Sequence, residues 1–123
     1  MFGEVIFNMG WEISSDMKLF NKVFPIVLSA DAYYESERIT SEQENAYREY
    51  ISNRDDISKM IEDVLLKESG NLEAALHRFS PTMLVIRKNG DYAFLINDKE
   101  DTDNGLAICI KPKFEVMTTD EYL

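Results

Sequence analysis

The chain has 123 residues, which suffices for one domain with an ordinary core and no cross-links. Its 23 acidic and 13 basic residues give a formal net charge of −10, which disfavours nucleic acid as a ligand because phosphate binding needs a basic surface. The same charge suits a basic partner. A solvated acidic surface without any partner explains it equally well.

The first thirty residues predict a meander of strands. Residues 2–7 are mostly apolar, and residues 11–19 alternate between apolar and polar with the period of a half-buried strand. Asn21-Lys22 is the expected turn before a third apolar run, residues 23–30. Pro25 lies in that run and cannot donate a hydrogen bond to a ladder, so the run lies at a sheet edge or begins after Pro25.

Two adjacent aromatic residues, Tyr33 and Tyr34, stand in a polar connection over residues 31–38. Tyrosines at such a place are candidate partner-binding anchors, since an aromatic ring offers a large contact area at low entropic cost. The alternative is a position at the rim of the core, with the hydroxyl in water.

The middle of the chain predicts two main helices. Thr40 and Gln43 have the spacing of a capping box, and we expect the first helix to end near Ser52, with Asn53 capping the second. The second helix has a clear apolar stripe and ends before Gly70, a favourable residue at a helix C-terminus. The stripe consists of Ile57, Met60, Ile61, Val64 and Leu65. Residues 71–79 predict a short helical turn or loop, and between residues 35 and 73 eleven acids face five bases, so we expect the excess charge mainly on the outer faces of the helices.

The strongest strand signal follows, in two apolar runs that flank Asn89-Gly90. This pair predicts a hairpin closed by a type I′ turn, because both turn residues accept a positive φ there. The resulting register places Leu84 and Ile86 on one face with Ala93 and Leu95. The other face then carries Val85, Tyr92, Phe94 and Ile96.

A further strand at residues 106–110 and a short last strand at residues 114–117 complete the expected sheet. Residues 118–123 predict a loosely held tail, although Tyr122 and Leu123 could tuck against the core. Short hairpin turns without regular strand-helix alternation indicate a single α+β domain over residues 1–123, with a mainly antiparallel sheet and the helix pair packed on one face.

An acidic cluster over residues 98–105 is the most suggestive feature for binding. Its oxygen ligands could hold calcium, but in EF-hand spacing Lys111 falls where a bidentate glutamate is needed. A hairpin turn whose acids are solvated or face a partner explains the cluster better. The candidate partner-binding residues here are Glu100, Asp101 and Asp103.

Signals for catalysis or cofactor binding are weak. His77 is the only histidine, and neither a zinc spacing nor a glycine-rich phosphate loop occurs. The single cysteine, Cys109, lies in an alternating strand and indicates a buried small apolar residue. We therefore expect no enzymatic activity, no cofactor and no metal. With neither a signal peptide nor a membrane-length apolar run, the expected location is the cytoplasm, without membrane attachment.

One resemblance adds to this interpretation. The residues that carry it are Ile39-Thr40, Gln43, Ala46-Tyr47, Asn53, Ile57, Pro81-Thr82, Leu84, Ile86, Gly90, Asp98, Asp103 and Gly105-Leu106-Ala107. Over about residues 20–123 they resemble a family of small acidic bacterial domains of unknown function, some of which are associated with toxin–immunity systems of the contact-dependent or polymorphic kind. The resemblance implies an immunity protein and supplies no catalytic residues.

Two functional hypotheses follow. The first is a toxin inhibitor, an immunity protein that covers the basic active site of a cognate bacterial toxin, for example a nuclease. The second is a regulatory module that binds a small molecule or forms a homo-oligomer. The acid excess separates them, because a metabolite pocket does not need it. A hydrolase, as a third option, would have to depend on His77 or on a particular carboxylate.

Overall fold

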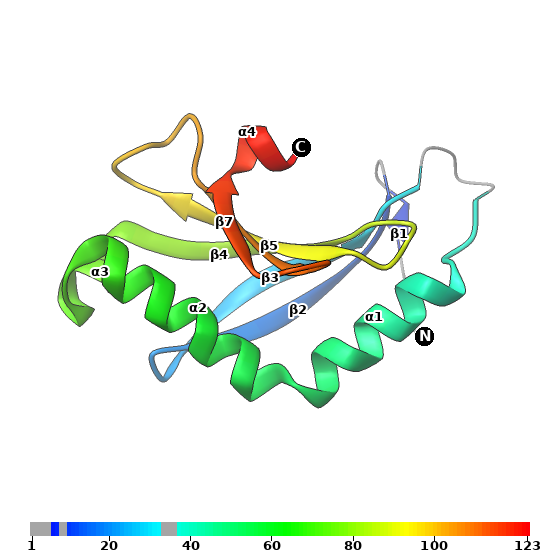
Figure 1. Cartoon of the computed structure of the whole chain (residues 1–123), viewed down its shortest axis with the longest axis horizontal. Helices are drawn as coiled ribbons and strands as arrows, with labels where there is room; N and C mark the ends of the chain where they lie inside the picture. Colours follow the sequence, from blue (N-terminus) through cyan, green and yellow to red (C-terminus); the bar gives the residue numbers. More distant parts are fainter. Residues whose placement is uncertain (1–5, 8–9, 33–36) are drawn as a thin grey trace.

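A computed structural model describes residues 6–7, 10–32 and 37–123 (Figure 1). Tyr33 and Tyr34 lie outside the described residues, as does most of the predicted strand over residues 2–7. The described residues form seven strands and four helices: β1 (Ile6–Phe7), β2 (Trp11–Leu19), β3 (Lys22–Ala30), α1 (Ser41–Ser52), α2 (Arg54–Ser69), α3 (Leu72–Arg78), β4 (Phe79–Ile86), β5 (Tyr92–Asp98), β6 (Leu106–Lys111), β7 (Glu115–Thr118) and α4 (Thr119–Tyr122).

The strands form one sheet in chain order, from β1 to β7. All neighbours are antiparallel except β3 and β4, which are parallel and are connected by the helical segment α1–α3. These three helices cover one face of the sheet, and the short α4 lies on the opposite side (Figure 1). The protein therefore has the predicted α+β fold, with a mainly antiparallel sheet.

The core lies between the sheet and the three helices of the crossover. Alternate residues of the central strands point to this side, and all of them are buried. The sheet contributes Phe24, Ile26, Leu28, Leu84, Ile86, Tyr92, Phe94, Ile96 and Ile108, and the helices contribute Ala46, Tyr50, Ile57, Ile61, Leu65 and Ala75. At about 1.5–3 kcal/mol for each fully buried large side chain, this layer is the main source of stability.

The predicted register of the β4–β5 hairpin was wrong by one residue. The Arg87 N–H donates to the Asp91 carbonyl at 2.7 Å and the Gly90 N–H donates to the Arg87 carbonyl at 2.9 Å, with a positive φ at Gly90. This is a three-residue loop with a type I turn and a bulged glycine, which replaces the expected two-residue turn. The additional loop residue exchanges the faces of one strand relative to the other.

In the observed register, the buried residues separate cleanly between the two faces. Ile86 pairs with Tyr92 and Leu84 with Phe94, so all four face the helices. Val85 pairs with Ala93 on the opposite face. A type I′ turn does occur, but between β2 and β3, where Phe20 and Asn21 have φ values of 53° and 61°. The turn expected at Asn21-Lys22 is thus one residue earlier.

At Pro25, β3 is paired with β2 but not yet with β4. The ladder with β4 begins at Val27, whereas Pro25 pairs with Asp16 of β2. The missing N–H of proline thus costs no hydrogen bond to β4. Both alternatives predicted for this run were wrong, because β3 begins at Lys22, before Pro25, and lies between β2 and β4 in the sheet.

The helix ends follow most of the sequence signals. Thr40 and Gln43 form the predicted capping box, α1 ends at Ser52, and Gly70 takes a left-handed conformation after α2. Asn53, however, does not cap α2 with its side chain, because its amide donates to the Glu49 carbonyl at the end of α1. Met60 is 36% exposed and lies outside the core stripe.

The C-terminus is held in place, which corrects the prediction of a loose tail. Thr118 and Glu121 form a second capping box that starts α4. The Arg87 guanidinium lies 4.3 Å from the centre of the Tyr122 ring and donates to the Tyr122 carbonyl. Leu123, in contrast, is 75% exposed. Tyr122 thus fixes α4 to the sheet.

Candidate binding surfaces

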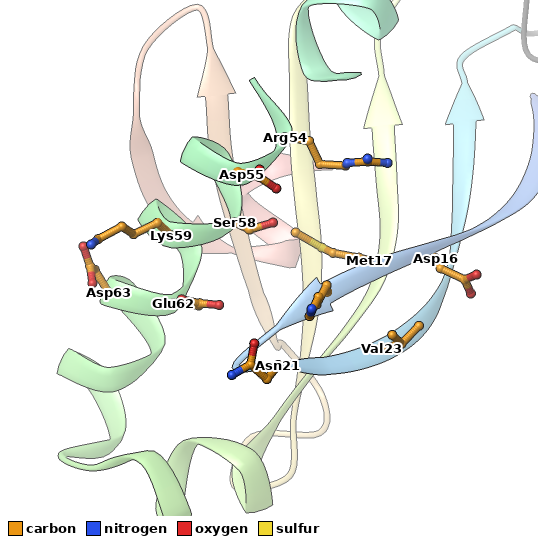
Figure 2. Close-up of a pocket in the computed structure, with 11 residues that line it drawn as sticks. Asp16, Met17, Asn21, Val23, Arg54, Asp55, Ser58, Lys59, Glu62 and Asp63 are labelled. Carbon is orange, nitrogen blue, oxygen red and sulfur yellow. The ribbon is translucent and has the colours of Figure 1, made fainter. Parts of the chain in front are cut away.

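A hollow with a volume of about 630 Å³, which we name the hairpin groove, lies between the β2–β3 hairpin and the first half of α2 (Figure 2). Helical spacing brings Arg54, Ser58 and Glu62 to one flank of α2, next to the buried stripe of Ile57 and Ile61. Ser58 and Glu62 point toward the hairpin, whereas Lys59 and Asp63 point away from it (Figure 2).

A hydrogen bond fixes the tip of this hairpin. The Phe20 N–H donates to the Glu62 carboxylate at 2.7 Å, and Phe20 has a left-handed backbone that is rare for an aromatic residue. A charged acceptor makes such a bond stronger than a neutral pair would. Glu62 therefore holds the strained turn against α2.

Charged residues make up most of the lining of the hairpin groove. Its lining residues include the acids Asp16, Asp55, Glu62 and Asp63 and the bases Lys18, Arg54 and Lys59, of which Lys59 and Asp63 direct their charged ends away from the hairpin (Figure 2). Neither histidine nor cysteine is among the lining residues. The groove can hold charged side chains of a partner, and it has no evident nucleophile with an adjacent base.

A second hollow, the loop groove, lies beside the β5–β6 loop and has a volume of about 390 Å³. Its walls are rich in hydroxyl and amide groups, from Ser80, Thr82, Asn97, Thr102, Asn104 and Thr119. Leu95 and Asp103 also line it. The groove therefore joins the acidic loop to the sheet face opposite α1–α3.

The acidic loop begins with an ion pair between the buried Asp98 and the partly exposed Arg78. Asp98 accepts hydrogen bonds from Arg78 Nε at 2.8 Å and Nη2 at 3.0 Å, and from the Glu100 N–H at 2.9 Å. The bidentate bond from Arg78 lowers the pKa of Asp98 below its ordinary value. Asp98 thus ties the loop to Arg78, the last residue of α3.

The three acids predicted to meet a partner lie in this loop but differ in their surroundings. Glu100 is within 2.9 Å of Arg78 Nε, although its side chain is 69% exposed. Asp101 accepts hydrogen bonds from the Asn104 amide at 3.2 Å and shapes the loop. Asp103 is exposed and forms no ion pair within 4 Å with another described residue. Asp103 is therefore the member with the most freedom to bind.

Other candidate reactive groups lie apart from both grooves. His77 is exposed on the last turn of α3 and lines neither hollow. The Cys109 thiol is buried and donates to the Lys111 carbonyl at 3.0 Å, and burial raises its pKa. Within the described ranges, no three His, Cys, Asp or Glu side chains are grouped to hold a metal ion.

None of the helices in the described part of the chain combines the length and apolar character needed to cross a bilayer. No family model, curated protein or solved structure matches the chain. What the protein binds must therefore be inferred from its own surfaces.

Sequence reasoning missed a third surface, the sheet face opposite α1–α3, which we name the open face. It consists of Val23, Pro25 and Val27 on β3, Met83 on β4 and Leu95 on β5. Val27, Met83 and Leu95 are only half-buried, and Pro25 is exposed. The apolar character of these positions was visible, but the wrong hairpin register placed Leu95 beside the buried Leu84.

Proposed function

We propose that this protein is a non-catalytic inhibitor of a basic bacterial toxin, an immunity protein that acts in the cytoplasm. A nuclease is the toxin class that fits best. Two features support the proposal: the net charge of −10 and the sequence resemblance to domains associated with toxin–immunity systems.

The observation that carries the proposal is a set of exposed carboxylates that the fold leaves unneutralised. They stand on several elements, and none has an ion-pair partner within 4 Å among the described residues: Asp16, Asp55, Asp56, Glu73 and Asp103. A nuclease must present a basic cleft to bind phosphate. An acidic protein can cover such a cleft and reach it quickly by electrostatic steering.

An immunity protein of this kind is expected to be encoded beside its toxin. The test is therefore to mix the purified protein with the product of the reading frame next to its own gene and to measure the association rate as sodium chloride rises from about 50 to about 500 mM. We expect a complex whose association rate falls by about tenfold or more, because salt screens long-range attraction. Co-expression should also protect cells from the neighbour's toxicity. The absence of a complex, or an association rate that salt does not change, would overturn the proposal.

The loop groove favours a second candidate function, binding of a small polar molecule. Its volume of about 390 Å³ and its hydroxyl and amide lining suit such a ligand. A set of sugars, nucleosides and amino acids can be screened for a rise in melting temperature. A rise that Thr82→Val abolishes would favour this function; melting temperatures unchanged by every compound would reject it.

A further inference from the structure

We propose that the open face is the surface on which the basic partner docks, with apolar contacts in its centre and ion pairs at its two ends. This inference rests on the proposed function and adds to it the binding face. The occupant is a protein that presents an apolar ridge flanked by lysine or arginine side chains.

The centre of the open face is an apolar row that crosses three strands. Val27 pairs with Met83, and Met83 pairs with Leu95, so their side chains lie next to one another on one face. Val23, two positions from Pro25 on the same side of β3, is 60% exposed. The opposite face of these strands is sealed by α1–α3, whereas α4 packs mainly on β6 and β7.

The two grooves adjoin the ends of this row. Val23 lines the hairpin groove together with Asp16 and Lys18, whereas Leu95 lines the loop groove together with Asp103. Each groove therefore shares one residue with the open face, Val23 at one end and Leu95 at the other. Hollows at both ends of the apolar row offer recesses that side chains of a partner can enter.

Charge at the margins selects a basic occupant. Asp16 pairs with Pro25 across β2 and β3, Asp103 borders Leu95, and Glu115 on β7 pairs with Cys109 of the same sheet face. The cationic residues that line the two grooves are Lys18, Arg54, Lys59 and Lys99, and they are outnumbered by the acids Asp16, Asp55, Glu62, Asp63, Asp98 and Asp103. An apolar centre surrounded by a polar rim is the usual anatomy of a protein–protein interface. Because acids outnumber bases in this rim, it favours a partner that presents lysine and arginine side chains.

The experiment compares two variants on the open face with two matched variants on α3, and the probe is the product of the neighbouring reading frame. Val23→Lys and Asp16→Lys alter the open face. Leu72→Lys and Glu73→Lys make the same changes on the helical side, where Leu72 is 49% exposed. We expect the open-face variants to weaken the dissociation constant by about tenfold or more and the α3 variants to change it by less than about twofold.

Each variant must first show the wild-type melting temperature, which the exposure of the substituted residues favours. Hydrogen exchange on the wild-type complex gives a second readout that needs no substitution. We expect binding to slow exchange of amides in β3, β4 and β5, and to leave α1 and α3 unchanged.

The outcomes separate the two proposals. If wild-type protein forms no complex, the proposed function fails and the docking surface fails with it. If a complex forms but α3 variants weaken it as much as open-face variants, or if protection falls on α1 and α3, only the docking surface is overturned. A homodimer in sedimentation that Val23→Lys dissociates would assign the open face to a second copy of this chain and would equally overturn it.

Discussion

At the scale of single residues, Asp98 carries the clearest electrostatic consequence. Its carboxylate is buried and receives two hydrogen bonds from Arg78, so Asp98→Asn removes the bidentate counter-charge and leaves the guanidinium with the more exposed Glu100 only. We expect this variant to lose about 2 kcal/mol of unfolding free energy at pH 7. Urea denaturation measures the loss, and Asp103→Asn, an exposed acid in the same loop, is the control that should change stability by less than about 0.5 kcal/mol.

The same pair predicts a pH dependence with a definite sign. Arg78 lowers the pKa of Asp98 in the folded state, so the carboxylate stabilises the fold above the unfolded pKa of about 3.9. Its contribution is lost as pH falls through the lower, folded value. The stability difference between wild type and Asp98→Asn should therefore narrow below about pH 4. A difference that stays constant from about pH 7 to about pH 2.5 would contradict this origin.

Gln43 is the second residue with a specific role, because it is fully buried and donates from Nε2 to two carbonyls. The bonds reach Asp31 at 3.0 Å and Ile86 at 3.1 Å, which ties the start of α1 to the ends of β3 and β4. Gln43→Glu replaces the donor with an oxygen that faces both carbonyls. We expect a loss of about 3 kcal/mol at pH 7, measured by urea denaturation.

The loss in Gln43→Glu should shrink as the pH falls toward about 4. Burial raises the pKa of the introduced carboxyl, and its protonated form can donate one of the two hydrogen bonds. Gln43→Met, which has no titratable group, should be destabilised to a similar degree at both pH values. Parallel pH profiles of the two variants would argue against this account.

At the scale of elements, the β5–β6 loop depends on the backbone of Gly105. Its φ is +63°, and a Cβ there would lie 2.7 Å from the carbonyl oxygen of Ile96. Gly70 also has a positive φ, but a Cβ added there would meet no atom within 4 Å among the described residues. We expect Gly105→Ala to cost about 3 kcal/mol and Gly70→Ala about 1 kcal/mol, measured by chemical denaturation. Equal costs would show that backbone conformation alone matters at Gly105.

Elements with local causes were predictable from sequence. Thr40 and Gln43 form the expected capping box because both partners lie within one helical turn, and Gly70 ends α2 because only a left-handed residue suits that place. The β4–β5 register was not predictable in this way. Asn89-Gly90 is compatible with two loop lengths, and the choice depends on Tyr92 and Phe94 packing under α1 and α2, which is a tertiary effect.

The candidate site divides in the same way. The acidic loop was evident from its sequence, yet Asp98 and Asp101 are used within the fold and Asp103 is not. That distinction depends on Arg78, which is twenty residues away, and on the turn that Asn104 makes. The open face was hidden by the register error, because Val27, Met83 and Leu95 become neighbours only when three strands are aligned.

At the scale of the whole molecule, α1–α3 cover one face of the sheet, whereas the short α4 on the other side packs mainly on β6 and β7 (Figure 1). A sheet with one fully sealed face needs no further partner for its fold. The half-buried residues of the open face are then available for binding without destabilising the free protein. Surplus carboxylates at the margins of that face keep copies of the free protein apart by mutual repulsion.

Raising the salt concentration should increase the stability of the free protein and decrease its rate of association with a basic partner. With a net charge of −10, the folded chain repels itself, so raising sodium chloride from about 10 to about 300 mM should increase the unfolding free energy by about 1 kcal/mol. The same salt should slow association with a basic partner, because it screens attraction between the two proteins. Urea denaturation and stopped-flow binding, measured in the same buffers, give both signs. If salt lowered stability as well as association, the described ion pairs would outweigh the surplus charge, and the carboxylates at the open face could not be treated as unneutralised.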